Sequence, residues 1–538
     1  MSVSPKNKNM KLNQIKFAAL LLGVSLATVF AQTNSLPLPP IAAGPFKADW
    51  NSLTNYQTPD WFRDAKFGIW AHWGPQCEPE HGDWYARSMY VQGNADYKSH
   101  VTEYGHPSTN GFKDVIHVWK AEHFDPDTLL KFYKDNGAKY FMALANHHDN
   151  LDLYNSKYQP WNSVNVGPHK DLIGGWAAAA RKNGLRFAVS VHAGRAWSWY
   201  EVAQGADTNG PLAGVPYDGK LTKADGQGLW WDGLDPQDLY AQNHTLGAKM
   251  DAAYWEKFFL RTKQLWDDYQ PDMIYFDDGL MPIHQGGEEY GLNLYAHFYN
   301  SSIQWHGRNE AVINAKGLNP TQREALVYDI ERGKAQEILP RPWQTDTCIG
   351  QWHYNAEVFK KHEYKSAASV VRMLADIVSK NGNLMLNVPL QRDGQPDTDE
   401  IKIVSEIGAW LKANGEAIYA TRPWKIYGEG PSTIESGEKN RFGGIKDVGS
   451  KPFMSEDIRF TQSKDGQTLY AIVLEVPKDG KIVIKSLARG SANWPGTIGG
   501  VRLVGGGKLK FTRDQAGLHV SLPEKFAGKI AFALKIHA

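Results

Sequence analysis

The chain has 538 residues, a formal net charge of +1 at pH 7 and 42% hydrophobic residues. This length allows a large core and more than one domain. The balance of 59 basic and 58 acidic side chains, without a basic tract, argues against nucleic acid or an acidic membrane as a partner. Most of the 20 tryptophans and 24 tyrosines are expected to pack in the core. Such a high aromatic content also favours a sugar-binding protein, because the C–H faces of sugars pack on aromatic rings.

The N-terminal segment has the pattern of an export signal. Four lysines between Lys6 and Lys16 precede an apolar run from Phe17 to Phe30, and Val29-Phe30-Ala31 fits the small-x-small cleavage rule. The run is too short for a comfortable membrane span. We therefore expect residues 1–31 to be a signal peptide and the mature protein to be periplasmic or secreted, without a membrane anchor.

Strand and helix patterns alternate from residue 66 to residue 414. Strands are expected at 66–73, 138–146, 185–192, 272–277, 311–315, 325–330 and 383–388. Helices are expected at 125–137, 172–183, 251–269, 291–305, 366–380 and 398–414, with Gly382 as the left-handed residue after the fifth. This alternation predicts an α/β fold, a (β/α)8-like barrel that forms a catalytic domain over residues 32–420.

Two further regions depart from the alternation. Residues 201–250 are rich in Gly, Asp and Pro, which is typical of a functional loop or a lid, and we expect Trp230 and Trp231 to contact a leaving sugar. After about Thr421, short β-type runs appear at 468–476, 481–486, 500–503 and 529–536. They predict a C-terminal antiparallel β-sandwich over residues 421–538, with a structural role favoured over sugar binding.

The two cysteines, Cys77 and Cys348, each follow an expected strand. Because exported proteins form disulfides, the two either pair or lie separately near the same end of the fold, and both alternatives stay open. Without histidines at a matching spacing they do not make a zinc site.

A short apolar run ends at Asp277, which is followed by Asp278 and a glycine. This is how a buried parallel strand ends at the mouth of a barrel. Because side chains alternate along a strand, Tyr275 and Asp277 are expected to point inward while Phe276 faces the helices. Asp277 is therefore the expected catalytic carboxylate. The alternative is that the segment forms only a solvated turn or a helix N-cap.

Other polar side chains at expected strand ends should reach the same mouth. His72 ends the first strand, and His147 and His148 follow the second. These histidines either hold substrate hydroxyls or bind a divalent metal together with Asp277. Aromatic residues expected near this mouth favour the sugar: Trp70, Trp73, Trp84, Tyr85 and Tyr154.

A glycosidase needs a second carboxyl group, and Glu331, which follows the run at 325–330, is the best placed. The alternatives, expected on helices or loops, are Glu324, Glu337 and Glu357.

Several motifs resemble the α-L-fucosidases of glycoside hydrolase family 29 over about residues 61 to 424. They are Phe-Gly-Ile-Trp-Ala-His-Trp-Gly (67–74), Asp-Trp-Tyr-Ala-Arg-Ser-Met-Tyr (83–90), Ala-Asn-His-His-Asp (145–149), Tyr-Phe-Asp-Asp-Gly (275–279), Arg-Pro-Trp-Gln-Thr (341–345) and Val-Ser-Lys-Asn-Gly-Asn-Leu-Met-Leu-Asn-Val (378–388).

This resemblance implies a retaining exo-glycosidase that releases terminal α-L-fucose from a fucosylated oligosaccharide or polysaccharide, without a metal or cofactor. It implies Asp277 as the nucleophile and Glu331 as the acid/base, the latter matched by its distance before Trp343. The substrate-binding residues expected on this basis are His72, Asp83, Trp84, His147, His148, His192 and Tyr275. The alternatives are an α-L-galactosidase on the same scaffold and a catalytically inactive sugar-binding protein.

Overall fold

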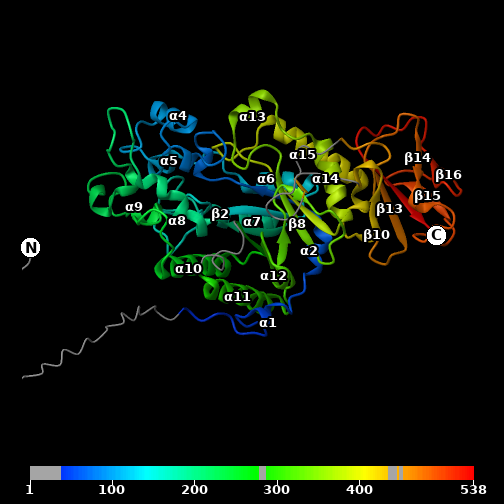
Figure 1. Cartoon of the computed structure of the whole chain (residues 1–538), viewed down its shortest axis with the longest axis horizontal. Helices are drawn as coiled ribbons and strands as arrows, with labels where there is room; N and C mark the ends of the chain where they lie inside the picture. Colours follow the sequence, from blue (N-terminus) through cyan, green and yellow to red (C-terminus); the bar gives the residue numbers. More distant parts are fainter. Residues whose placement is uncertain (1–37, 278–285, 434–444, 447–451) are drawn as a thin grey trace, which may run out of the picture. The chain divides into compact units, whose positions relative to one another are not determined.

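The computed structural model describes residues 38–277, 286–433, 445–446 and 452–538 (Figure 1). Eight parallel strands close into a barrel in the order β1-β2-β3-β4-β5-β6-β8-β9. Their bounds are β1 Phe67–Ala71, β2 Tyr140–Asn146, β3 Arg186–Val191, β4 Met273–Phe276, β5 Val312–Ala315, β6 Val327–Asp329, β8 Trp343–Cys348 and β9 Gly382–Asn387. The predicted (β/α)8-like barrel is confirmed.

Strand β8 was absent from the sequence prediction because it reads Trp-Gln-Thr-Asp-Thr-Cys and has no apolar run. Side chains from other strands form hydrogen bonds with its inward-pointing Gln344 and Asp346. Gln344 donates from Nε2 to Asn314 Oδ1 and to Asp329 Oδ2, each at 3.0 Å, and Asp346 accepts from the Tyr275 hydroxyl at 2.9 Å. A polar strand can be buried in this barrel because each inward polar group meets a partner.

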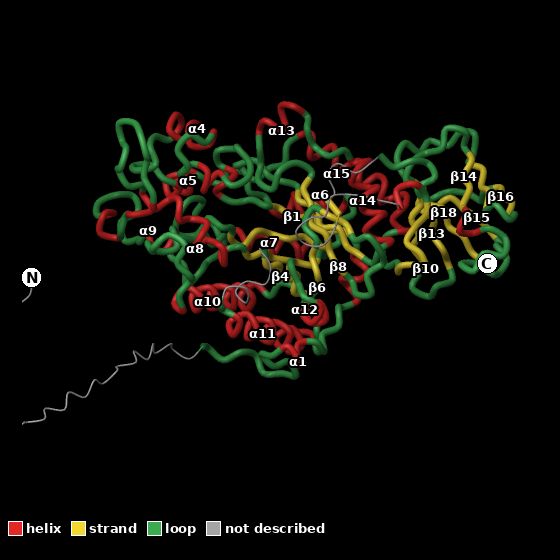
Figure 2. The backbone as a smooth tube through the Cα atoms, viewed as in Figure 1, coloured by secondary structure: helices red, strands yellow, loops and turns green. Residues whose placement is uncertain are grey.

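Helices lie around the outside of these strands (Figure 2). The longer ones are α6 Pro126–Asp135, α7 Leu172–Lys182, α10 Ala252–Tyr269, α11 Glu288–His306, α14 Ala367–Ser379 and α15 Thr398–Asn414. The shorter ones are α1 Trp50–Leu53, α2 Asp60–Ala65, α3 Tyr85–Ser88, α4 Ala95–Glu103, α5 Phe112–Val118, α8 Ala196–Trp199, α9 Pro236–Leu239, α12 Pro320–Ala325 and α13 Ala356–Lys361.

Side-chain caps explain where the predicted helices begin. Asp125, Asp251 and Ser366 each accept a backbone N–H from the first turn of α6, α10 and α14. The expected role of Gly382 is wrong. The left-handed residue after α14 is Asn381, with φ of 72°, and Gly382 already belongs to β9. A Cβ at Gly382 would lie 2.6 Å from the Trp343 ring, so glycine is required there for packing.

The C-terminal region forms two antiparallel sheets, and the predicted β-sandwich is confirmed. One sheet has the order β10-β12-β13-β18-β15 and the other the order β14-β17-β16. Their bounds are β10 Arg422–Glu429, β12 Ile458–Gln462, β13 Thr468–Val473, β18 Phe532–His537, β15 Gly500–Leu503, β14 Lys481–Ile484, β17 Leu518–Ser521 and β16 Lys510–Arg513. Both sheets contribute to one apolar cluster, which includes Phe460, Ile484 and Leu534.

The sandwich is joined to the barrel by buried polar contacts. Arg459 of β12 donates to Asp376 of α14 at 2.6 Å, and Trp410 of α15 donates to the Ala531 carbonyl at 2.5 Å. A two-stranded sheet pairs β7 (Gly333–Lys334) with β11 (Ile445–Lys446). These contacts support the structural role expected for the C-terminal region.

The expected signal peptide lies outside the described residues. Within the part of the chain that the structure describes, every helix is too short or too polar to cross a membrane. Cys77 and Cys348 are both buried and are not bonded to each other, since Cys77 faces the His72 carbonyl and Cys348 the Gly350 carbonyl.

Candidate active site

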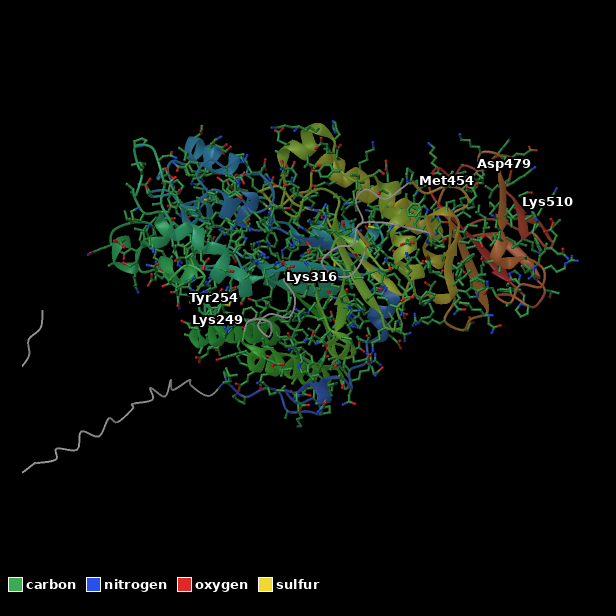
Figure 3. The ribbon with its side chains drawn as sticks, viewed as in Figure 1. Lys249, Tyr254, Lys316, Met454, Asp479 and Lys510 are labelled. Carbon is green, nitrogen blue, oxygen red and sulfur yellow. The ribbon has the colours of Figure 1, made fainter. Side chains whose placement is uncertain are left out.

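A pocket opens at the carboxyl ends of the barrel strands. It is lined by Trp70, His72, Trp84, His147, His148, His192, Arg195, Asp277, Lys316, Glu331, Asp346 and Trp352; Figure 3 labels Lys316. In barrels of this kind the ends of several strands bring reactive side chains together at this face.

The end of β4 places Asp277 in the pocket, as the alternation of side chains predicts. Phe276 points outward, where its ring lies 5.9 Å from Tyr295 and 6.5 Å from Phe298 of α11. Tyr275 points inward and donates to Asp346. Asp277 follows on the inward side, whereas Asp278 lies outside the described residues.

Asp277 is held as a carboxylate by three neighbours. Lys316 Nζ donates to Oδ1 at 2.5 Å, while His192 Nδ1 and His148 Nε2 lie 3.1 and 3.5 Å from Oδ2. Burial raises the pKa of Asp277, but the Lys316 ammonium and the two histidines outweigh it and hold that pKa well below its usual range. A buried carboxylate that stays ionised is suited to act as a nucleophile.

Lys316 links this carboxylate to the second expected catalytic group. Its side chain is 3% exposed, and Nζ donates to Glu331 Oε2 at 2.9 Å as well as to Asp277. Burial lowers the pKa of Lys316, but the nearby carboxylates of Asp277 and Glu331 raise it well above its usual value. Lys316 is therefore a permanent cation between the two carboxyl groups.

The hydrogen-bond partners assign a tautomer to two of the histidines. His72 Nδ1 lies 3.1 Å from Asn387 Oδ1, an acceptor, so it carries the proton and Nε2 accepts. His147 Nδ1 accepts from Gln76 Nε2 at 2.8 Å, so its Nε2 donates. Burial lowers the pKa of both rings well below the usual value. One neutral acceptor and one neutral donor suit hydroxyl groups, which do both.

Three buried nitrogens at this pocket have no aligned partner among the described residues. They are Nδ1 and Nε2 of His192, whose Nδ1 approaches Asp277 without hydrogen-bond alignment, and the indole N–H of Trp70. Buried polar groups are normally hydrogen-bonded. A polar ligand in the pocket would supply the missing partners.

Comparison with known proteins identifies the family. The model of the family described as "Alpha-L-fucosidase" matches residues 38–416, a range that holds the barrel and every residue lining the pocket. The chain belongs to the α-L-fucosidase family. A second model, described as "Alpha-L-fucosidase C-terminal domain", matches residues 451–537.

The sequence is also similar to curated α-L-fucosidases along most of its length. Tissue alpha-L-fucosidase of Macaca fascicularis is 25% identical over 488 residues, which cover 89% of this chain and 88% of the relative. The Mus musculus enzyme is 26% identical over 488 residues, covering 89% of this chain and 91% of the relative.

Solved structures agree with the fold of this family member. The Thermotoga maritima alpha-fucosidase solved with a mechanism-based inhibitor superposes with a TM-score of 0.68 at 25% identity, covering 92% of this chain and all of that one. Alpha-L-fucosidase isoenzyme 1 from Paenibacillus thiaminolyticus superposes with a TM-score of 0.60 at 20% identity, covering 91% and 99%, and shows the fold alone.

The structure of this fucosidase separates residues that line the pocket from residues that support it. All predicted site residues line the pocket except Asp83 and Tyr275. Asp83 accepts from the His353 backbone N–H at 2.8 Å, and Tyr275 lies buried beneath the pocket. Of the aromatic residues expected at the mouth, only Trp70 and Trp84 are among the lining residues.

Trp84 has an unusual conformation for a bulky side chain. Its φ is 69°, in the left-handed region, and its side chain is 44% exposed at the pocket. The Arg195 guanidinium lies 5.9 Å from the ring centroid. Backbone strain of this kind is concentrated at functional sites.

The expected contact of Trp230 and Trp231 with a leaving sugar is not supported by the structure. The Trp230 ring stacks on His117 at 4.1 Å and donates to Asp114, both in α5, while Trp231 is buried. Neither residue lines the pocket. Trp231 is buried, whereas Trp230 packs on α5 and stays 38% exposed.

Two groups of side chains bring nitrogen and oxygen atoms close enough to suggest a metal: His72, His147 and His192, and His148, His192 and Asp277. The first group does not offer three lone pairs, because both nitrogens of His147 are committed, one to Gln76 and one to its proton. In the second, the Asp277 carboxylate is already paired with Lys316. The residues therefore suit hydroxyl binding better than a metal ion.

Four lining residues were not among the predicted ones: Arg195, Lys316, Asp346 and Trp352. Lys316 directly follows β5, the same position relative to a strand that drew attention to Asp277. That signal alone could have found it. Asp346 lies in the strand that the sequence did not predict, and Trp352 in the loop after it.

Proposed function

We propose that this family member is a retaining exo-glycosidase that releases terminal α-L-fucose from fucosylated oligosaccharides or polysaccharides. The observation that carries the proposal is the position of Lys316 Nζ, 2.5 Å from Asp277 Oδ1 and 2.9 Å from Glu331 Oε2. Those two oxygens are therefore at most about 5.4 Å apart, which fits the spacing of carboxyl groups in retaining enzymes and not the wider spacing of inverting ones.

In the first step, the Asp277 carboxylate attacks the anomeric carbon and Glu331 gives its proton to the leaving oxygen. The bond to the leaving group breaks, Asp277 becomes an ester and Glu331 becomes a carboxylate. In the second step, Glu331 removes a proton from water, which displaces Asp277 and releases fucose. The negative charge thus passes from Asp277 to Glu331. Lys316 contacts both groups, so it can stabilise the charge on either one without moving far.

The remaining lining residues bind the sugar in this proposal. His72 and His147 present one acceptor and one donor to hydroxyl groups, and His148 and His192 keep Asp277 oriented. Trp70 and Trp84 supply aromatic faces for the C–H side of fucose. Asp83 and Tyr275 act indirectly, by fixing the loop of His353 and the side chain of Asp346.

We also propose that residues 1–31 direct export, which makes the mature protein periplasmic or secreted, and that the catalytic and C-terminal domains divide near residue 420. Support for the division comes from the end of α15 at Asn414 and the start of β10 at Arg422.

The test is hydrolysis of an aryl α-L-fucoside followed by proton NMR. The first sugar anomer released should be the α-anomer. A first product with the β-configuration would contradict the double displacement. No hydrolysis by folded protein would favour an inactive sugar-binding protein, and faster hydrolysis of the α-L-galactoside would favour the galactosidase.

A further inference from the structure

Two buried carboxyl groups lie behind Lys316 and have no part in the double displacement. Asp329 ends β6 and is 0% exposed, and Asp346 in β8 is 1% exposed. Asp346 Oδ2 accepts from the Tyr275 hydroxyl and lies 3.9 Å from Lys316 Nζ. Asp329 Oδ2 accepts from Gln344 Nε2 at 3.0 Å.

The other oxygen of each carboxyl group, Oδ1, receives no donor from the described protein groups. The two carboxyl groups instead lie within hydrogen-bonding reach of each other. Two carboxylates offer only acceptors, so a hydrogen bond between them requires one proton. Like charges this close in a buried site do not both ionise, and the pair titrates as one unit.

The surroundings indicate which residue holds the proton. Burial and the neighbouring Asp346 raise the pKa of Asp329 well above its usual value. Burial also raises the pKa of Asp346, but the Lys316 ammonium opposes this effect. Because Lys316 Nζ lies 3.9 Å from Asp346 Oδ2, the geometry favours the single negative charge on Asp346 and the proton on Asp329.

The groups that face this pair come from several strands. Lys316, Asp277 and Glu331 face it from the pocket, and Tyr275 and Tyr140 face it from inside the barrel. Tyr328 precedes Asp329 in β6 and points to the opposite face, where its ring packs against Arg323. Burial raises the pKa of these three tyrosines, so they stay neutral. Lys316 is therefore the positive group that the pair shares with Asp277 and Glu331.

We propose that Asp329 and Asp346 share one proton and serve as a positioning pair, whose single negative charge anchors the Lys316 ammonium and disfavours a second negative charge on Glu331. This inference rests on the proposed roles of Asp277 and Glu331. Asp329 is fully buried, and Asp346 lines the pocket beside Lys316. The pair holds Lys316 in place and helps the resting enzyme to keep a proton for the leaving group at the pH where Asp277 is already ionised.

Infrared spectroscopy of the ligand-free enzyme tests the shared proton without substrate. With isotope-labelled aspartate, the wild type at neutral pH should show the carbonyl band of a protonated carboxyl group, and Asp329→Asn should show a weaker band. Equal band intensity in the two proteins would overturn the proposal. Because no turnover is measured, this result does not depend on which residues are the nucleophile and the acid.

The pH profile of kcat/KM tests the effect of the charge. On the alkaline side of the profile, kcat/KM falls as the acid loses its proton, and this fall is the basic limb. Asp329→Asn keeps the charge on Asp346, so its basic limb should stay close to that of the wild type. The double variant Asp329→Asn/Asp346→Asn removes the charge, and its basic limb should fall by about one pH unit. Asp346→Asn alone moves the charge to Asp329, farther from Lys316, and should lower the pH of the basic limb by a smaller amount.

The matched control is Thr345→Val in the same strand, which removes two hydrogen bonds to the carbonyls of Ile330 and Gly333. It should lower the melting temperature without moving the basic limb. A basic limb that stays in place in both Asp346→Asn and the double variant would show a purely structural pair and overturn the proposal. If the double variant does not fold, Asp346→Asn and the infrared comparison decide.

Discussion

Replacing Lys316 by methionine should remove the cation that contacts both proposed catalytic carboxyl groups. The methionine side chain has a similar length and fills the same space, but it cannot pair with Asp277 or Glu331. Among the described residues in contact with Asp277, His148 and His192 then remain as neighbours that favour its charged form. We expect a weaker nucleophile at acidic pH and a less stable fold.

The magnitude follows from the buried geometry. An opposite charge at this distance lowers the pKa of a carboxyl group by about 1–3 units, so the acid limb of kcat/KM in Lys316→Met should rise by about 1–3 pH units. The same shift corresponds to about 1.4–4 kcal/mol of unfolding free energy lost at neutral pH. Lys316 is 3% exposed, so solvent screening reduces this figure little.

The sign of the pH dependence is fixed by the direction of the shift. The pKa of Asp277 is depressed in the folded protein, so its contribution to stability is present above the unfolded value of about 4 and is lost as the pH falls through the folded value. The stability difference between wild type and Lys316→Met should therefore be largest at neutral pH and shrink toward acidic pH.

The assay is kcat/KM for an aryl α-L-fucoside from acidic to neutral pH, together with urea unfolding at several pH values. Lys316→Arg keeps the charge and should leave the acid limb near its wild-type position. Lys380→Met is the matched control, since Lys380 is also buried and pairs with Asp376 at 2.8 Å away from the pocket. It should lower stability without moving the acid limb. An acid limb in Lys316→Met identical to that of the wild type would refute the reasoning.

Asp277→Asn should fold normally and lower kcat by more than about 1,000-fold, because no covalent intermediate can form; near-normal turnover would move the nucleophile elsewhere. Glu331→Ala should slow a fucosyl disaccharide about 10²–10⁴-fold, but activated aryl fucosides far less, and azide should rescue it by forming a glycosyl azide. Equal losses without rescue would point to Glu324 or Glu337. Activity should survive exhaustive dialysis against EDTA, and a loss that zinc, manganese or calcium reverses would establish a metal site. Hydrolysis of an aryl α-L-galactoside should be measurable and at most about 100-fold slower, because aromatic contacts reject an added hydroxyl only modestly.

The strand ends that build most of this site were predictable from local sequence. An apolar run followed by polar residues marks His72, His147 and Asp277, and the period of two along a strand places Asp277, unlike Phe276, on the inward face. These features depend on neighbours in the chain, so they can be recognised without knowing the fold.

Strand β8 could not be recognised in this way, and the position of Lys316 directly after β5 did not by itself show that its side chain is buried. A run such as Gln-Thr-Asp-Thr resembles a solvated loop, and a lysine after a strand is usually a surface residue. Both are buried here because their partners come from other strands. Gln344 meets Asn314 and Asp329, and Lys316 meets Asp277 and Glu331.

The division between Asp83 and Trp84 was also decided only by the tertiary structure. The two are adjacent in one motif, yet Trp84 lines the pocket while Asp83 turns to the backbone of His353, 270 residues away. Burial of a polar or charged group is favourable only when distant segments supply its hydrogen bonds and opposite charges. Hydrophobic period predicts where a strand runs and ends, whereas the partners that permit a buried charge exist only after the barrel has closed.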